Sequence, residues 1–222
     1  MAELMVTGGT GRSSLVPNSE IYDPETGEWE LLGNHTRRVF QTAVLLPDGS
    51  AFVTGGSGDT AYQESAEAYS PITDAWTRLE PMTYGRSGHT AALFDDGRVI
   101  VIGGIGLTAS GNVQTHRSTE VFDPVDGIWS NGGQLQKERS GHAMTVLPDG
   151  RIFVVGGTDD IGFLASAEMY DPATDEWTTL GEMHGPRLSH RATALPDGRV
   201  LVSGGFTGSD TIASLEIYDP GR

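Results

Sequence analysis

Short apolar runs alternate along the chain with turns rich in glycine, proline and aspartate. In the clearest segments, such as HTAALFDDGRVIVIGG and HAMTVLPDGRIFVVGG, two apolar runs flank an Asp-Gly step. This pattern predicts a tight β-hairpin, because both residues tolerate the positive φ of a type I′ turn. The steps between such runs are Asp48-Gly49, Asp96-Gly97, Asp149-Gly150 and Asp197-Gly198. No apolar run is long enough to cross a bilayer.

The pattern recurs with a period near 50 residues, which is the signature of a repeat architecture. Glycine pairs that end an apolar run are 47, 48, 53 and 48 residues apart: Gly8-Gly9, Gly55-Gly56, Gly103-Gly104, Gly156-Gly157 and Gly204-Gly205. Each pair is followed by an aromatic residue two positions before proline: Tyr22, Tyr69, Phe122, Tyr170 and Tyr218. Tryptophan follows seven residues after the first four aromatics: Trp29, Trp76, Trp129 and Trp177.

Each period has room for four short antiparallel strands. The hairpin supplies the first and second strands, the aromatic residue ends the third, and tryptophan lies on the fourth. We predict a single domain over residues 1–222, with repeats at approximately 1–37 (partial), 38–85, 86–138, 139–186 and 187–222 (partial). This division predicts 18 strands, three in each partial repeat and four in each complete one.

Double glycine after the second strand, an aromatic residue on the third and tryptophan a fixed step later resemble the kelch repeat. The resemblance extends over nearly the whole chain, and strands such as RVLVSGG look like those of bacterial kelch and galactose-oxidase-type propellers. It implies an all-β fold, a kelch-type β-propeller of four-stranded antiparallel blades with about 4.5 repeats.

The number of repeats leaves the closure of the ring open. The partial repeats could stand as incomplete blades in a five-bladed ring, or the first strand of the last repeat could complete the first blade of a four-bladed one. Alternatively, oligomerisation completes the ring, or the chain is a fragment or an engineered piece of a larger one. Open blade edges are unpaired strands, so we expect a homo-oligomer.

Residues that recur in every repeat are best explained by needs that every blade shares. The glycine pairs allow close backbone approach or positive φ, and the tryptophans are expected to fill the space between neighbouring blades. A glutamate also precedes each repeated aromatic by two residues: Glu20, Glu67, Glu120, Glu168 and Glu216. Ion pairs between these glutamates and four repeated arginines would be a structural feature of the blades.

The four arginines also have a functional interpretation. They begin the first strand of their repeats: Arg38, Arg86, Arg139 and Arg187. Arg86-Ser87-Gly88 and Arg139-Ser140-Gly141 match an element that lines the cavity rim in peptide-binding kelch domains. The resemblance therefore implies a partial ring of guanidinium groups that could hold a carboxylate or phosphate bidentately. Pairing with the repeated glutamates is the alternative.

Histidine follows the last three arginines by three residues, at His89, His142 and His190. Three histidines can hold a metal, but equivalent positions on a propeller lie around a ring, and no acidic partner recurs with them. We therefore predict structural hydrogen bonds for these histidines, no metal site and no other cofactor.

The third repeat departs from the others. The distance from the glycine pair to the aromatic residue is 14 residues in four repeats and 19 in the third, between Gly103 and Phe122. Loops carry function on such scaffolds, so we predict ligand contacts in this extension. Its candidate residues are Asn112, Gln114, His116 and Arg117. An inert surface insertion is the alternative.

Charge and cysteine content narrow the function. The formal net charge is −16, and so acidic a surface repels phosphate groups; we therefore predict neither a nucleic-acid partner nor a membrane partner. Cysteine is absent, which excludes disulfides and a cysteine nucleophile. The first residues show no charged leader before an apolar segment, so no signal peptide is expected, and the compartment is left open.

These observations favour a non-catalytic scaffold that binds a protein, peptide or glycan through its loop face and channel rim. The copper site of galactose oxidase needs a tyrosine cross-linked to cysteine, which this chain cannot form. A sugar-modifying enzyme of the sialic-acid mutarotase kind, also built on a kelch propeller, is the alternative.

Overall fold

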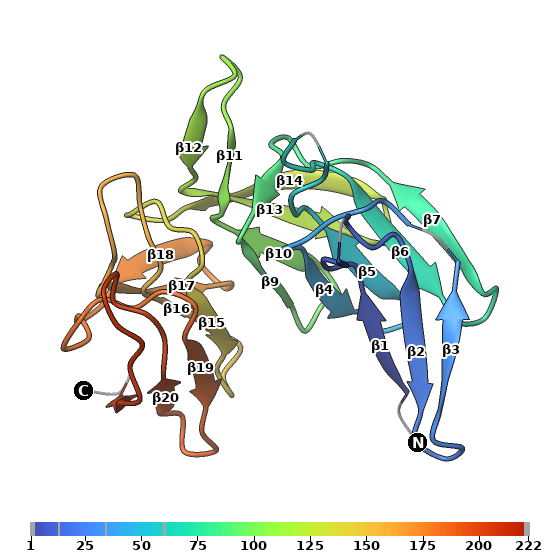
Figure 1. Cartoon of the computed structure of the whole chain (residues 1–222). Helices are drawn as coiled ribbons and strands as arrows, with labels where there is room; N and C mark the ends of the chain where they lie inside the picture. Colours follow the sequence, from blue (N-terminus) through green and yellow to red (C-terminus); the bar gives the residue numbers. More distant parts are fainter. Residues whose placement is uncertain (1–2, 13, 34, 60, 220–222) are drawn as a thin grey trace.

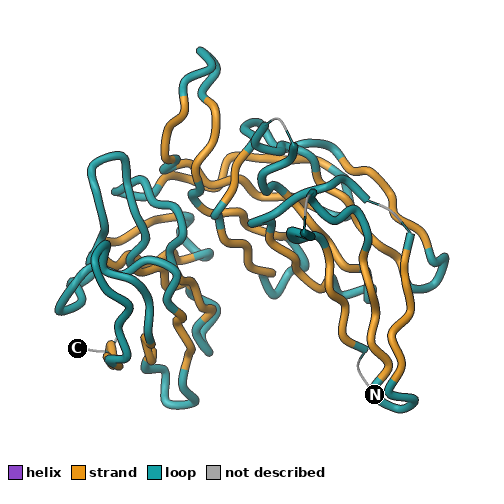
Figure 2. The backbone as a smooth tube through the Cα atoms, in the orientation of Figure 1, coloured by secondary structure: helices purple, strands orange, loops and turns teal. Residues whose placement is uncertain are grey.

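The computed structural model consists of strands, turns and loops (Figures 1 and 2). It describes residues 3–12, 14–33, 35–59 and 61–219. Within these ranges there are 21 strands and no helix. The described residues thus offer no helix that could pass through a membrane.

Eighteen strands form five antiparallel sheets in chain order, which are the blades. The first blade contains β1 (Leu4–Thr7), β2 (Ser19–Asp23) and β3 (Glu28–Leu32). The second contains β4 (Thr42–Leu45), β5 (Ala51–Thr54), β6 (Ala66–Ser70) and β7 (Ala75–Leu79). The third contains β9 (Thr90–Leu93), β10 (Val99–Ile102), β13 (Ser118–Asp123) and β14 (Ile128–Gln134).

The fourth blade contains β15 (Ala143–Val146), β16 (Ile152–Val155), β17 (Ala167–Asp171) and β18 (Glu176–Thr179). The fifth contains β19 (Arg191–Ala194), β20 (Val200–Ser203) and β21 (Leu215–Tyr218). A small extra sheet is made of β8 (Arg86–Ser87), β11 (Ile105–Leu107) and β12 (Val113–Thr115). The kelch-type all-β fold and the predicted number of blade strands are confirmed, and the extra sheet was not predicted.

The Asp-Gly hairpins do not form the predicted type I′ turn. Between β4 and β5, the Leu46 N–H donates to the Ser50 carbonyl at 2.8 Å, and the Gly49 N–H donates to the Leu46 carbonyl at 3.0 Å. Gly49 has a φ of +85°, whereas Asp48 keeps a negative φ. Pro47 presets a negative φ at the first loop position, as Pro148 and Pro196 do in two of the other hairpins, and Asp95 takes this position in the third repeat with the same hydrogen bonds. Each loop therefore has three residues, with a type I turn and a left-handed glycine.

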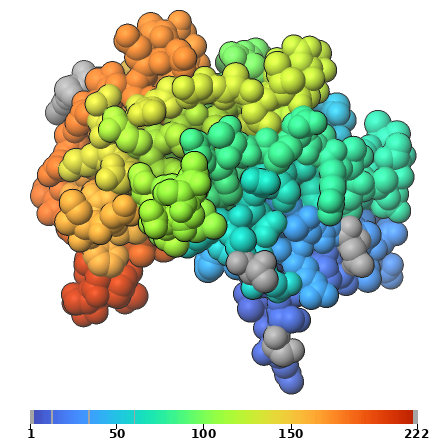
Figure 3. Space-filling model, turned by 90° about the horizontal axis from the view of Figure 1, so that it is seen from above, coloured from blue at the N-terminus to red at the C-terminus, as the bar shows by residue number. Residues whose placement is uncertain are grey.

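The ring is not closed within the chain. The first blade has the order β1-β2-β3, so the first strand of the last repeat, β19, does not complete it. The blue first blade and the red last blade lie apart, with open space between them (Figures 1 and 3). The closure in which β19 completes the first blade is therefore wrong, because the strands of each end blade pair with their neighbours in sequence. The partial repeats do form the incomplete blades of the five-bladed alternative, but that ring is not closed because the two end blades lie apart.

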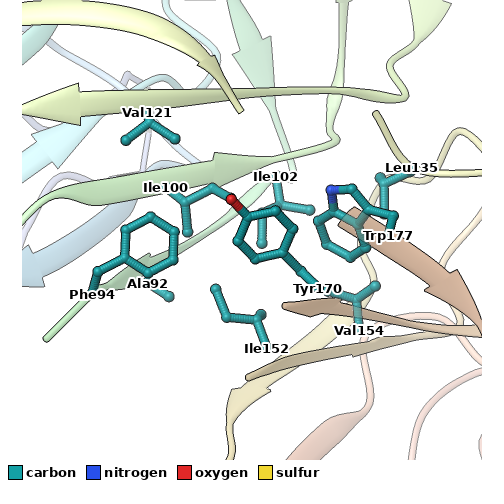
Figure 4. Close-up of a cluster of buried hydrophobic side chains, with 10 residues drawn as sticks. All are labelled: Ala92, Phe94, Ile100, Ile102, Val121, Leu135, Ile152, Val154, Tyr170 and Trp177. Atoms are coloured by element: carbon teal, nitrogen blue, oxygen red, sulfur yellow. The ribbon is translucent and has the colours of Figure 1, made fainter. Parts of the chain in front are cut away.

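Neighbouring blades pack through apolar faces. Between the third and fourth blades, Ile100 and Ile102 of β10 meet Ile152, Val154 and Trp177 in one buried cluster (Figure 4). A second cluster joins the second and third blades, and a third joins the fourth and fifth. Alternate residues of each second strand face opposite neighbours, so a strand such as β16 is buried on both sides.

The glycine pairs lie at the contact between blades. Gly156 has a φ of +65°, and a Cβ atom there would lie 2.5 Å from His190 Cε1 and 2.7 Å from the Arg187 carbonyl oxygen. The Gly157 N–H donates to the same carbonyl at 2.7 Å. Glycine is required because it adopts this conformation without strain and leaves room for the next blade.

Candidate functional site

The five-residue extension of the third repeat forms a projecting hairpin. Strands β11 and β12 pair with each other, and β11 also pairs with β8, so the hairpin stands away from the blades (Figure 1). Loops at the same place in the other complete repeats form only isolated bridges. The Thr115 N–H donates to Asp160 Oδ1 of the next blade at 2.9 Å, which ties the base of the hairpin to its neighbour.

Two adjoining pockets lie at the base of this hairpin. One has a volume of about 320 Å³ and the other about 230 Å³, and both are lined by Tyr84, Ser118 and Gln134. The larger pocket also reaches Trp129 and Asn131, across the outer strands of the third blade. The smaller pocket is completed by residues of the hairpin and the chain that leaves it: Thr108, Ala109, Gln114, His116 and Arg117.

An aromatic pair forms the wall between hairpin and blade. The rings of Tyr84 and His116 stack with centroids 5.6 Å apart and planes 29° apart. Tyr84 keeps part of its surface exposed, whereas His116 is buried. Burial, followed by the nearby Arg86 guanidinium, lowers the pKa of His116 to about 4, so the ring is neutral at pH 7.

Three of the four loop candidates meet at these pockets. Gln114 and Arg117 are exposed and line the smaller pocket beside the buried His116. Asn112 is not among the lining residues; its Nδ2 donates to Ser110 Oγ at 3.2 Å near the hairpin tip. The predicted ligand contacts are therefore consistent with the positions of Gln114, His116 and Arg117, which line a pocket, and are not supported for Asn112, which does not.

Sequence reasoning missed the residues that the third blade contributes. Gln134 ends the unusually long strand β14, whose pairing with β13 shifts register between Ser118 and Glu120. Gly132 and Gly133 lie at this irregularity, and their carbonyls both accept from the Thr119 hydroxyl. This glycine pair, which is out of step with the other pairs, was the available signal.

The repeated arginines lie beneath the surface instead of around a ligand-facing rim. Arg139 has no exposed surface: its Nη1 donates to the carbonyls of Gly156 and Ser166 at 2.9 and 3.1 Å, and its Nη2 donates to Glu168 at 2.6 Å. The same partners recur for the others, which are Arg38, Arg86 and Arg187. The rim interpretation is corrected for these four residues, because their Nη donors bind within their own blade.

The glutamates of this network also hold the loop that enters each blade. Glu120 accepts from the Thr83 N–H at 2.7 Å as well as from Arg86 at 2.6 Å, and Glu168 accepts from two loop N–H groups. Burial would raise the pKa of Glu216, but hydrogen bonds from His184 and Arg187 outweigh it and lower the pKa to about 2. A serine two residues before each glutamate completes the network and was an overlooked signal: Ser65, Ser118, Ser166 and Ser214.

The three repeated histidines lie in separate contacts between blades. His89 packs against Gly55, His142 against Gly103 and His190 against Gly156. His142 Nε2 lies 2.8 Å from Thr90 Oγ1. Burial lowers the pKa of His89 to about 3 and that of His190 to about 4. No cluster of three or more metal-binding side chains is found among the described residues.

The pocket pair offers binding groups more than reactive ones. Its one carboxylate, that of Glu120, is engaged by Arg86 and the Thr83 N–H, and its histidine is neutral and buried. The remaining polar groups are hydroxyls, amides and the guanidinium of Arg117. Such groups donate and accept hydrogen bonds beside aromatic rings, as in sites that recognise small polar ligands.

The comparisons with known proteins agree with this architecture. A family model described as the Attractin/LZTR1 beta-propeller matches residues 2–215. A solved structure titled "Structure of YjhT" is 16% identical, with a TM-score of 0.76, over 97% of this chain and 81% of that one. At this identity the likeness concerns the fold. No curated protein matches the chain.

Proposed function

The chain belongs to the Attractin/LZTR1 β-propeller family, and we propose that it is a non-catalytic binding propeller that holds a glycan in the pocket pair beside the β11–β12 hairpin. The single observation that carries the proposal is the convergence of the hairpin with the irregular outer strands of the third blade. Among the described residues no other blade carries such a hairpin, so the site is a local addition to a repeated scaffold.

The lining chemistry favours a glycan over a peptide. Tyr84 and Trp129 provide aromatic surface, while Gln114, Asn131 and Gln134 supply amide donors and acceptors for a small, hydroxyl-rich ligand. The lining consists of separate hydroxyl, amide and aromatic groups, whereas the apolar face of a helical peptide would need a continuous apolar groove. Arg117 is the one lysine or arginine among the lining residues, which favours a sugar that carries a carboxylate.

The test is a screen against an array of immobilised neutral and acidic oligosaccharides, followed by calorimetric titration of any glycan that binds. Tyr84→Ala should weaken binding about tenfold, because it removes one stacking surface worth about 1 kcal/mol or slightly more. Arg117→Gln should reduce the preference for acidic over neutral sugars. Asn112→Ala at the hairpin tip is the matched control and should bind like the unchanged protein. Absence of binding to every glycan, with binding to peptides, would refute the proposal.

A mutarotase-type enzyme is the competing function that the kelch resemblance raised. It is distinguished by proton NMR of sialic acid, which reports the exchange between its two anomers. Binding without faster exchange supports the scaffold. Accelerated exchange that is lost in Tyr84→Ala and retained in Asn112→Ala would replace the binding function with a catalytic one at the same pocket.

A further inference from the structure

The two end blades expose the same faces that form the core between internal blades. Inside the chain, β16 and β17 of the fourth blade pack against β20 and β21 of the fifth. This contact uses the second and third strands of each blade, and clusters of the same kind join the second blade to the third and the third to the fourth. Both end blades retain these strands.

The fifth blade exposes the face that would meet a following blade. Leu215 and Ile217 on β21 are 65% and 56% exposed. Their counterparts one repeat earlier, Ala167 and Met169, lie in the buried cluster between the fourth and fifth blades. The fifth blade therefore has the residues of an interface and no described residue that covers them.

The first blade exposes the opposite face, which would meet a preceding blade. Leu4 and Val6 on β1 and Trp29 on β3 correspond to Ile152, Val154 and Trp177 of the fourth blade, which are buried. In the first blade they are 58%, 48% and 51% exposed. This face is therefore the complement of the one that the fifth blade presents.

Both exposed faces carry larger or more apolar side chains than the other repeats have at the same positions. Leu31, two residues after Trp29, is 62% exposed, while the matching positions in the complete blades are polar: Arg78, Asn131 and Thr179. Leu215 is the bulkiest residue at its position, where the other repeats have small ones: Ser19, Ala66, Thr119 and Ala167. Exposed apolar groups gathered on one face mark a contact surface.

We propose that the occupant is a second copy of this chain, with the fifth blade of one copy seated on the first blade of the next. The contact continues the blade-to-blade interface that the chain already uses. It joins two different surfaces, so each copy keeps one free face and can accept a further copy. The sequence had suggested pairing through strand edges; the exposed side chains point to the blade faces instead.

The charge of the chain adds a second signature. Each copy carries a formal charge of −16, so like-charge repulsion opposes an apolar contact between copies. Salt screens this repulsion, and at 1 M the screening length falls to about 3 Å. Association through these faces should therefore strengthen as salt is added, whereas association through ion pairs would weaken.

The experiment is sedimentation velocity and light scattering across a hundredfold concentration range. The unchanged chain should exceed its monomer mass of 23.6 kDa increasingly with concentration. One variant blocks the fifth blade (Leu215→Glu with Ile217→Glu), and a second blocks the first blade (Leu4→Glu with Leu31→Glu). Each should weaken association at least tenfold, because a carboxylate replaces an apolar side chain at the contact. A mixture of the two variants should form a dimer and nothing larger, because one compatible pair of faces remains.

The matched control is Ile72→Glu with Val125→Glu, which makes the same change in charge at turn residues that are exposed and lie outside both faces. It should associate like the unchanged chain. Circular dichroism and thermal unfolding establish that all variants keep the fold. A constant monomer at every concentration, association that survives both blocking variants, or a mixture that stays monomeric would each overturn the proposal.

Discussion

Replacing Glu168 by glutamine tests whether the buried Arg–Glu network stabilises the blades. The substitution keeps the shape of the side chain and removes its negative charge. Arg139 would then remain a cation with no exposed surface and no counter-ion, although its bonds to the Gly156 and Ser166 carbonyls persist. Breaking one partner of a buried pair costs about 3–5 kcal/mol, because the remaining charge stays desolvated.

The loss should appear as a lower midpoint in urea unfolding at pH 7. With a slope of about 3 kcal/mol per molar urea, the expected decrease in midpoint is about 1 to 1.7 M. Tryptophan fluorescence is a suitable signal, because Trp177 lies in the cluster between the third and fourth blades. The slope itself should not change, since the folded state keeps its burial.

The control is a second ion pair of the chain, which has nearly the same distance between its charged groups but is exposed to solvent. Arg151 and Asp149 form an ion pair at 2.7 Å in an exposed turn, against 2.6 Å for the buried pair. Asp149→Asn should cost less than about 1 kcal/mol, because water already solvates both charges. Equal losses in the two variants, or a loss below about 1 kcal/mol in Glu168→Gln, would refute the reasoning from burial.

Three further pairs of measurements follow from matched positions. Thermal unfolding of two glycine variants separates steric clash from backbone strain. Gly156→Ala should destabilise the fold by more than about 3 kcal/mol, because the added Cβ has no room. Gly204 has the same φ of +65° but no atom within 3.4 Å of an added Cβ, so Gly204→Ala should cost about 1–2 kcal/mol. Trp177→Ala should cost about 3–5 kcal/mol, whereas the half-exposed Trp29→Ala should cost less than about 1 kcal/mol at concentrations where the chain is a monomer. Similar losses in dilute solution would show that the open face of the first blade is covered in the monomer. Burial lowers the pKa of His89 to about 3, so between pH 6.5 and about 3 the unfolded chain binds a proton that the folded chain does not, and the free energy of unfolding falls with pH. About 2 kcal/mol should be lost between pH 7 and 5, and His89→Gln should flatten this decline.

The blades could be predicted from the sequence because their determinants are local. Each hairpin, glycine pair and tryptophan recurs at a fixed step, and all 18 predicted blade strands are present. Turn type was misjudged, since Asp48-Gly49 was considered without the proline that precedes it. The β11–β12 hairpin was visible only as a longer spacing, because its strands are short and its sequence is polar.

The candidate site was only partly predictable. Gln114, His116 and Arg117 were found because they lie in the extension, but Tyr84 and Gln134 reach the same pockets from other segments. Sequence distance gives no indication of that meeting. The arginines were open to two interpretations, since an arginine at the start of an inner strand can point toward the channel or into its own blade.

The strands and their grouping into blades follow from the sequence alone, because alternation and turn chemistry act over a few residues. Two features emerge only in the folded chain: Arg139 turns inward to Glu168, and the first and fifth blades do not meet. Those outcomes depend on which surfaces lose water together. Burial is a property of the whole arrangement and is not carried by any single repeat.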